Sequence, residues 1–495
     1  MFKSLISKFK GVLYKMGLLK GLKSVSDRTD FLISDTMYNH IQVWLALYKG
    51  HLGRYKDEPF HDIKYMTLNG PKKRRMLSLG MAKVVSQEMA NLVFNEKCSI
   101  SIDDKEYHEN IINVLDDNGF YDKFQSHLEY MFATGGMVIK VYSDLENIKL
   151  SFVHADAFIP LSDDGKNIRE GIFVNESTKG KYYYTLLEFH VWENEIYTIK
   201  NELYKSETKA ELGIKVSLSE MYDNMEEVIS IPGLVRPLFV YFKPNSANNV
   251  DLYSLLGVSI FSNSLDTLKT IDTIYDSYQR EFRLGKKKII VPETAVKAGV
   301  DLDGNLRRHF DADNEVYESF NIGGDDESTK GSIVDISPDL RVEEHIAGIN
   351  NNLNILASQT GFSAGAFSFD SAGLKTATEV VSENSKTYRT RNGHITMIEE
   401  GLKDLIQIIG DVAVLYELFQ APDEYEVSIS FDDSIAEDRS SNAAYWIMLT
   451  NSGIISKEYA AQKILKITEE EAIEMTAKAK ADNEFTQVNP FGDGA

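Results

Sequence analysis

Residues 254–284 read SLLGVSIFSNSLDTLKTIDTIYDSYQREFRL, and this stretch decides the fold class. Its apolar residues recur at steps of three and four, which is the spacing of one face of a helix. The residues of that face are Val258, Phe261, Leu265, Leu268, Ile271, Tyr275, Tyr278 and Phe282. Asp266, Asp272 and Asp276 lie between them. The pattern predicts a long amphipathic helix with acids between its apolar residues.

On the C-terminal side of this helix the chain passes through five segments of different composition. Lys286–Val291 has the composition of a strand, and residues 293–339 are polar, with twelve Asp or Glu against four Lys or Arg. A second helix is expected at 340–359, followed by a loop of small residues, Gly361–Leu374. The next helix, about 376–420, carries an apolar stripe that we expect to pack in the core of its own subunit. This stripe consists of Ile395, Ile398, Leu402, Leu405, Ile409, Val412, Tyr416 and Phe419.

On the N-terminal side, a helical region gives way to strands. Helices are expected at 36–56, 72–97 and 106–134, and Gly135 and Gly136 are interpreted as a turn. Alternating residues then predict antiparallel strands at 137–142, 149–153, 171–175, 181–192 and 195–200. A short strand at 424–431 and two or three helices over 440–482 complete the pattern, with Ser456 and Thr468 as expected N-caps. The fold class is therefore α+β.

Composition excludes several classes of function. The single cysteine, Cys98, cannot form an intrachain disulfide, and no apolar run is long enough to span a bilayer. The net charge of -22 is the opposite of what a protein that grips DNA phosphates needs. An acidic protein can still let DNA slide past without binding it. The clusters Lys72–Arg75 and Lys286–Lys288 are interpreted as solvated faces or as neutralisation of an acidic neighbouring subunit, with phosphate contact as the alternative.

Few sequence motifs in the chain suggest catalysis or the binding of a metal or nucleotide. Gly361–Gly365 (GFSAG) has the pattern of a serine-hydrolase elbow, but that elbow requires a strand before the serine and a helix directly after it. Asp301–Asn305 departs from a calcium loop in the position of its glycine. The ten histidines form no metal-ligand pair at helical spacing, and phosphate-binding glycine loops are absent. We expect no enzyme activity, no cofactor and no metal.

Five segments in order resemble the portal proteins of long-tailed bacteriophages of Gram-positive bacteria. They are Met81–Lys97 (MAKVVSQEMANLVFNEK), Phe132–Tyr142 (FATGGMVIKVY), Pro237–Pro244 with Ser254–Phe261, Asp272–Val291 (DTIYDSYQREFRLGKKKIIV) and Gln359–Glu383 (QTGFSAGAFSFDSAGLKTATEVVSE). Their order and spacing are similar to the family over nearly the whole chain. Each segment alone is a weak signal, and the ordered set is fairly specific.

The resemblance implies a portal-type subunit made of named parts. These are a helix-rich wing with an antiparallel sheet (1–253 and 376–431), a two-helix stem (254–285 and 340–360), a small α/β clip (286–339), a tunnel loop (361–375) and a helical crown (432–482). The tail 483–495 is expected to be disordered, and no counterpart in the family is claimed for it. The resemblance further implies a homo-oligomeric ring, by resemblance a dodecamer, at a vertex of the virion capsid. The ring is assembled in the host cytoplasm and serves as a channel for packaging and ejecting double-stranded DNA. Implied partners are the terminase large subunit, the head–tail adaptor, and the major capsid and scaffolding proteins.

The same resemblance assigns expected roles to particular residues. The tunnel-loop residues expected to face DNA are Ser363, Phe367, Phe369, Ser371, Ala372 and Lys375. The stem acids expected to line the channel are Asp266, Asp272 and Asp276. The clip acids expected to dock partners are Asp301, Asp303, Asp311, Asp313, Asp325 and Asp326.

Two other classes of function remain open on the sequence. One is a serine hydrolase that uses Ser363. The other is a peripheral membrane or scaffold protein, because residues 1–23 have six lysines, no acid and apolar residues at helical spacing.

Overall fold

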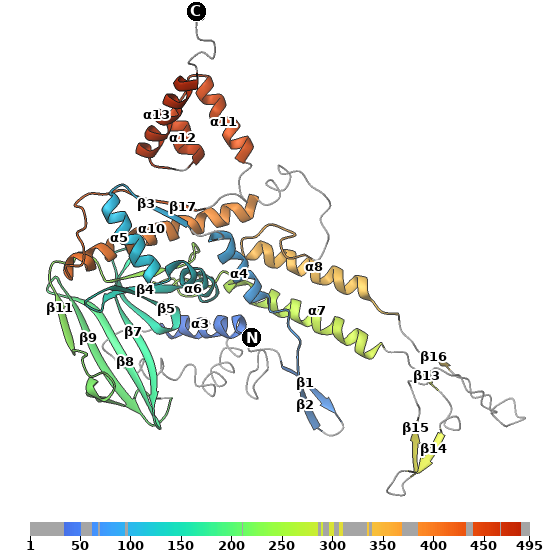
Figure 1. The fold of residues 1–495 in the computed structure, drawn as a ribbon. Coiled ribbons are helices and arrows are strands. Elements are labelled where there is room, and N and C mark those ends of the chain that lie inside the picture. The colour runs from blue at the N-terminus through green and yellow to red at the C-terminus, as the bar shows by residue number, and fades with distance from the viewer. Residues whose placement is uncertain are drawn as a thin grey trace, which may run out of the picture.

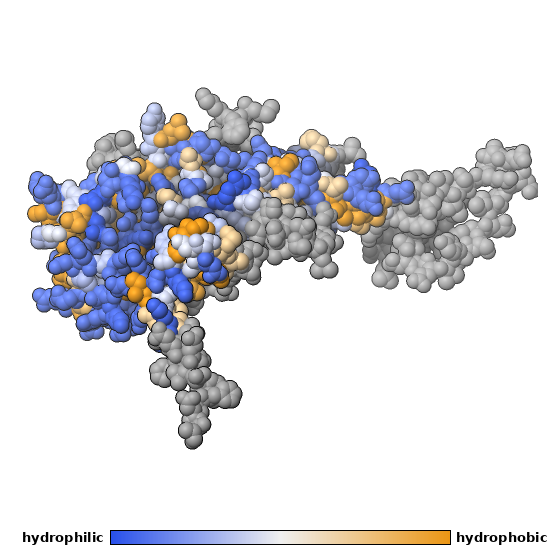
Figure 2. Space-filling view, turned by 90° about the horizontal axis from the view of Figure 1, so that it is seen from above, coloured by the Kyte–Doolittle hydropathy of each residue, from blue (hydrophilic) through white to orange (hydrophobic). Residues whose placement is uncertain are grey.

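A computed structural model describes residues 34–50, 62–67, 70–94, 98–209, 211–285, 289–290, 297–300, 306–309, 334–335, 339–368, 385–431, 439–465 and 467–486. It combines helices with antiparallel sheets, so the predicted α+β class is confirmed. A central body of helices has a curved sheet on one side, a projecting helix pair on the other and a small helical unit above (Figure 1). Seen from above, the coloured surface is mainly hydrophilic with scattered apolar patches (Figure 2).

The N-terminal helices of the body pack around aromatic side chains. They are α3 (Asp35–Tyr48), α4 (Met81–Val93), α5 (Lys105–Asp117) and α6 (Phe120–Thr134). Ser34 caps α3 by accepting a hydrogen bond from the Met37 backbone N–H at 3.3 Å, and Asp104 caps α5 in the same way at 2.8 Å from Tyr107. Phe120 and Phe124 are fully buried and stack with ring centroids 4.9 Å apart. These contacts anchor α6 at the centre of the core.

The helix predicted for 72–97 is wrong at its beginning. Strands β1 (Asp62–Thr67) and β2 (Gly70–Arg75) form an antiparallel hairpin, and the helix begins only at Met81. Gly80 has φ 66°, a left-handed conformation that L side chains rarely adopt, and it separates the hairpin from α4. The run Lys72–Arg75 therefore lies in a strand.

Two sheets form the curved side of the molecule, and the predicted strands are all present. The three-stranded sheet has the order β12-β4-β5, and the larger one the order β10-β9-β8-β7-β6 with β11 also paired to β9. The strands are β4 (Met137–Ser143), β5 (Ile148–His154), β6 (Phe158–Asp163), β7 (Ile168–Lys179), β8 (Tyr182–Glu193), β9 (Ile196–Ser206), β10 (Ile214–Val216), β11 (Val228–Ile231) and β12 (Phe239–Phe242).

Gly135 and Gly136 do more than make a turn. Gly135 ends α6 with φ 91°, and a Cβ there would lie 2.5 Å from the carbonyl oxygen of Gly257. The backbone of 257–258 therefore passes directly against the end of α6. This approach explains why residues 254–261, predicted to be helical, are irregular.

The projecting pair consists of α7 (Leu265–Leu284) and α8 (Val342–Gln359). The two helices run antiparallel side by side (Figure 1), with Thr267 bonded to Gln359 at 2.9 Å near one end. Near the other end Arg341 pairs with Glu281 at 3.0 Å. The described strands between them are β13 (Ile289–Ile290), β14 (Lys297–Val300), β15 (Leu306–His309) and β16 (Val334–Asp335).

Helix α10 (Ser385–Leu415) crosses the body, and its apolar stripe is buried as expected for a helix in its own subunit's core. The buried stripe residues are Ile398, Leu402, Leu405, Ile409 and Val412. Strand β17 (Val427–Phe431) then pairs with β3 (Cys98–Ile102).

The last unit contains α11 (Arg439–Asn451), α12 (Lys457–Leu465) and α13 (Glu469–Thr486). Both predicted N-caps are confirmed. Ser456 accepts from the Tyr459 N–H at 3.1 Å, and Thr468 and Glu471 form a reciprocal capping box.

Candidate functional site

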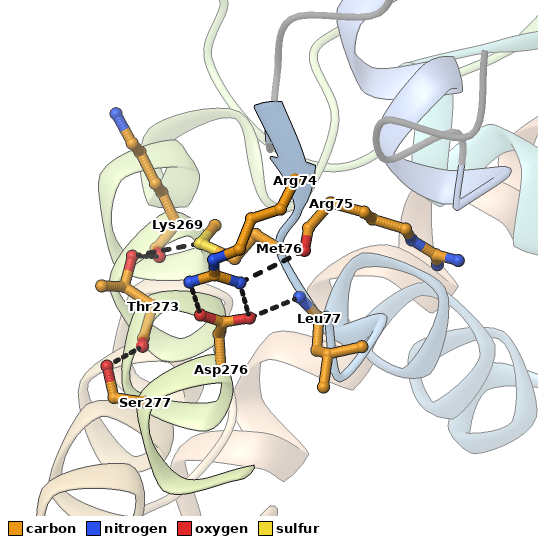
Figure 3. Close-up of polar contacts among 8 residues, drawn as sticks. All are labelled: Arg74, Arg75, Met76, Leu77, Lys269, Thr273, Asp276 and Ser277. Carbon is orange, nitrogen blue, oxygen red and sulfur yellow. Dashed lines mark hydrogen bonds and ion pairs between the residues drawn. The ribbon is translucent and has the colours of Figure 1, made fainter. Parts of the chain in front are cut away.

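The site begins with two buried acids on α7. Asp276 is 3% exposed and forms a bidentate ion pair with Arg74 of the hairpin, with nitrogen–oxygen distances of 2.8 and 2.5 Å (Figure 3). The same carboxylate accepts the Leu77 N–H at 3.1 Å. Hydrogen bonding to the Arg74 guanidinium lowers the pKa of Asp276 below its ordinary value. The acid therefore stays charged while buried.

Asp272, one helical turn earlier, has a similar role. It is 5% exposed and accepts the Leu79 N–H at 2.9 Å. Residues 76–80 lie between a strand and a helix, so their backbone donors need partners from outside. The expectation that Asp272 and Asp276 line a channel is corrected, since both lie inside the subunit. The sequence carried a signal for this, because Leu268, Asp272 and Asp276 are spaced four apart on one helical face.

Asp266 differs from these two acids because it is exposed. Along its face of α7, Thr270, Thr273 and Ser277 are also exposed, and each hydroxyl donates to the carbonyl four residues earlier at 2.8, 2.8 and 2.9 Å. Their donors are therefore satisfied within the helix. The hydroxyls of this face are thus not available to a phosphate, and Lys269 is the exposed cation beside them.

The segment after α8 is closed by a clamp between Ser363 and Thr387, the third residue of α10. The Ser363 N–H donates to Thr387 Oγ1 at 2.8 Å, and the Thr387 N–H donates to Ser363 Oγ at 3.3 Å. The two hydroxyls also lie 3.2 Å apart. The clamp joins the two ends of the segment 364–386.

This geometry corrects the expectation that Ser363 faces DNA, because the residue is 3% exposed. Phe367 is half-buried and packs on the buried Phe362, with ring centroids 4.8 Å apart. Four further loop residues with an expected DNA-facing role lie outside the described residues: Phe369, Ser371, Ala372 and Lys375. The same holds for the clip acids Asp301, Asp303, Asp311, Asp313, Asp325 and Asp326.

Ser363 and His394 do not form a nucleophile–base pair. The Ser363 hydroxyl bonds to Thr387, whereas His394 Nδ1 accepts the Asn245 N–H at 3.0 Å. Burial lowers the pKa of His394 to about 4. A helix precedes Ser363 where a hydrolase elbow has a strand. These contacts assign both residues to packing.

The single cysteine is buried as well. Burial raises the pKa of the Cys98 thiol to about 12, which keeps it protonated. No three His, Cys, Asp or Glu side chains in the described part of the chain come together as metal ligands. None of the helices among these residues is both long and apolar enough to cross a bilayer.

Comparison with known proteins identifies the family. The model of the family described as "Phage portal protein, SPP1 Gp6-like" matches residues 31–484. The chain therefore belongs to this family of phage portal proteins. The comparison with curated proteins gave no match.

Two solved structures are similar to the chain at low identity. One, titled "Virion of native gene transfer agent (GTA) particle", has a TM-score of 0.44 and 11% identity, covering 92% of this chain and 99% of that chain. The other, "Neck of empty GTA particle computed with C6 symmetry", has a TM-score of 0.42 and 11% identity, covering 77% and 89%. The family assignment rests on the family match alone.

Proposed function

We propose that this protein is the subunit of a ring-shaped portal at a capsid vertex, through which double-stranded DNA is packaged and ejected. The observation that carries the proposal is the family match over 31–484. The proposed stoichiometry is a dodecamer. The protein acts as a conduit and not as an enzyme, with the terminase large subunit supplying the work of packaging.

We assign the parts of such a subunit to elements of the fold as part of this proposal. In this proposal the sheets and α3–α6 form the wing together with α10, and the α7–α8 pair forms the stem. Residues 286–339 form the clip that meets the terminase and later the head–tail adaptor. Helices α11–α13 form the crown, and residues 361–375 form the tunnel loop. The wing meets the major capsid and scaffolding proteins.

The net charge of the chain and the exposed side chains of α7 support the proposal of a channel through which DNA slides without being held. DNA has about one negative charge per 1.7 Å of its axis, so clustered Lys or Arg in the lumen would hold it. The chain has a net charge of -22, and on the exposed face of α7 the cation Lys269 lies near Asp266, among hydroxyl side chains that are already bonded. We propose that this face, and not Asp272 or Asp276, lines the channel.

The test is to purify the full chain, determine its particle mass by light scattering across several salt concentrations and image it by negative stain. We expect a ring with a central hole that restores packaging when added to portal-free proheads. A chain that remains monomeric at micromolar concentration in every salt condition overturns the proposal.

A further inference from the structure

The β1–β2 hairpin carries exposed cations for which neither the fold nor the proposed function accounts. Lys64, Lys72 and Arg75 are exposed in a chain whose net charge is -22. In the antiparallel register Lys72 lies opposite Tyr65, and Lys64 lies opposite Lys73. Since alternate residues of a strand point to opposite faces, the hairpin presents cations on both faces.

The base of this hairpin is held firmly. Arg74 and the Leu77 N–H are both bonded to buried Asp276 (Figure 3). The Leu79 N–H is bonded to Asp272. Ile63 and Arg74 line an open hollow of about 370 Å³ against α7. The hairpin is therefore fixed in direction by contacts at its base.

The rest of the hairpin projects from the body (Figure 1), and among the described elements its strands pack mainly on each other. Tyr65 is 43% exposed and Met66, next to the turn, is 77% exposed. An isolated two-stranded hairpin is marginally stable in water. A projecting hairpin with a rigid base, exposed cations and the exposed side chains of Tyr65 and Met66 is suited to contact an acidic partner that also offers apolar surface.

We propose that the β1–β2 hairpin docks on an acidic surface of a neighbouring copy of this chain. The inference rests on the ring proposed above, because it needs adjacent copies. Charge complementarity identifies the partner, since each copy has a net charge of -22 and the hairpin is strongly basic. In a ring the neighbouring copy is also always present at high effective concentration.

DNA is the competing acidic partner, and it fits less well. Several Lys and Arg contacts to phosphates would hold DNA in place, which conflicts with sliding through a channel. Phosphates also make no use of the exposed Met66 side chain. A protein surface satisfies both the charged and the apolar parts of the hairpin.

The decisive experiment uses the DNA-free full chain and the double variant Lys64→Glu/Lys72→Glu. We expect the concentration needed for ring formation to rise about tenfold or more, most strongly at low salt. The matched control is Lys105→Glu/Lys123→Glu, which makes the same charge change at exposed positions on α5 and α6 and should assemble like the wild type. If the glutamate variant does not fold, as judged by circular dichroism, Lys64→Gln/Lys72→Gln takes its place.

A second measurement locates the contact directly. Rings made from mixed ¹⁴N- and ¹⁵N-labelled chains are treated with a zero-length carbodiimide, and we expect Lys64 or Lys72 to crosslink to an Asp or Glu of the other isotope. Variant rings that assemble normally but retain less DNA would assign the hairpin to DNA and overturn the inference. If the wild type forms rings, the glutamate variant assembles equally well and no such crosslink is found, the hairpin inference is wrong but the proposed ring stands. If the wild type is monomeric, both the hairpin inference and the proposed ring are wrong.

Discussion

At the residue scale, the pairing of Arg74 with Asp276 stabilises the subunit because both carboxylate oxygens are used. One oxygen also accepts the Leu77 N–H, so a single side chain joins α7 to the strand and to the turn that follows it. Removal of one partner would leave the other charge without compensation in a mainly buried site. Arg74 is 23% exposed, which allows water to recover part of that loss.

Asp276→Asn should therefore lower the free energy of unfolding by about 2 kcal/mol, in the range for hydrogen bonds to charged groups. Because the pKa of Asp276 is lowered in the folded state, its contribution is complete above the pKa of the unfolded chain, near 4, and is lost as the pH falls through the lower folded value. Urea denaturation at pH 7 and in steps below pH 4 measures both effects. A difference between variant and wild type that stays constant down to pH 2 contradicts this account.

The Ser363–Thr387 clamp allows a second prediction. Thr387→Val keeps the shape of the side chain but leaves the buried Ser363 N–H without its acceptor, which should cost about 1–3 kcal/mol. Hydrogen exchange of the Ser363 amide should accelerate in step with that loss. Unchanged exchange would mean that the two ends of the segment 364–386 are held by other contacts.

Ser363→Ala provides the comparison for Thr387→Val and tests the non-enzymatic role. The variant removes the two longer bonds of the clamp, at 3.3 and 3.2 Å, but keeps the 2.8 Å bond from the backbone N–H of position 363 to Thr387. Assembly and DNA packaging should therefore stay near normal. Esterase activity is the additional readout. A large loss of a measurable esterase activity in this variant would reopen the hydrolase hypothesis.

At the scale of elements, the sequence predicted best where one period extended over many residues. The stripe Ile398–Val412 and the strands from Met137 to Lys200 were found because their burial follows a regular step. The run Lys72–Arg75 was wrongly joined to a helix because its strand has no alternating apolar pattern. Asp272 and Asp276 were misplaced because their partners, Arg74 and two backbone N–H groups, lie almost 200 residues away. The spacing of the two acids with Leu268 indicates the buried face, but no local pattern identifies partners so distant in the sequence.

Two helical glycines, Gly401 and Gly348, allow the effect of a Gly→Ala substitution on stability to be compared at a tightly packed and at an open position. A Cβ on Gly401 in α10 would lie 2.5 Å from the buried Phe242 ring, whereas a Cβ on Gly348 in α8 would lie 3.8 Å from Ile274. Gly401→Ala should destabilise by about 1–3 kcal/mol despite the higher helix propensity of alanine. Gly348→Ala should stabilise by roughly 0.5–1 kcal/mol. Thermal unfolding of both variants, compared with the wild type, tests whether close helix packing decides the sign.

At the scale of the whole molecule, a charge change at one residue is repeated in every copy of the subunit around the proposed ring. Asp266 is the one predicted channel acid that the structure leaves exposed, whereas Asp272 and Asp276 are buried. If the exposed face of α7 lines the channel, Asp266→Lys places a ring of positive charge around DNA. The substitution is at an exposed helical position, so the subunit should fold and assemble normally.

Asp266→Lys rings should package DNA more slowly than wild-type rings, because each new cation adds an attraction to phosphate that must be broken at every step of translocation. The defect should shrink as salt increases, since phosphate contacts weaken with ion concentration. The control is Asp116→Lys, an equal charge change at an exposed position on α5. Packaging rates in a single-particle assay at several salt concentrations distinguish the two variants. Equal rates for Asp266→Lys and the wild type at low salt would place this face of α7 away from DNA, and equal slowing by both variants would show that net charge acts from anywhere on the subunit.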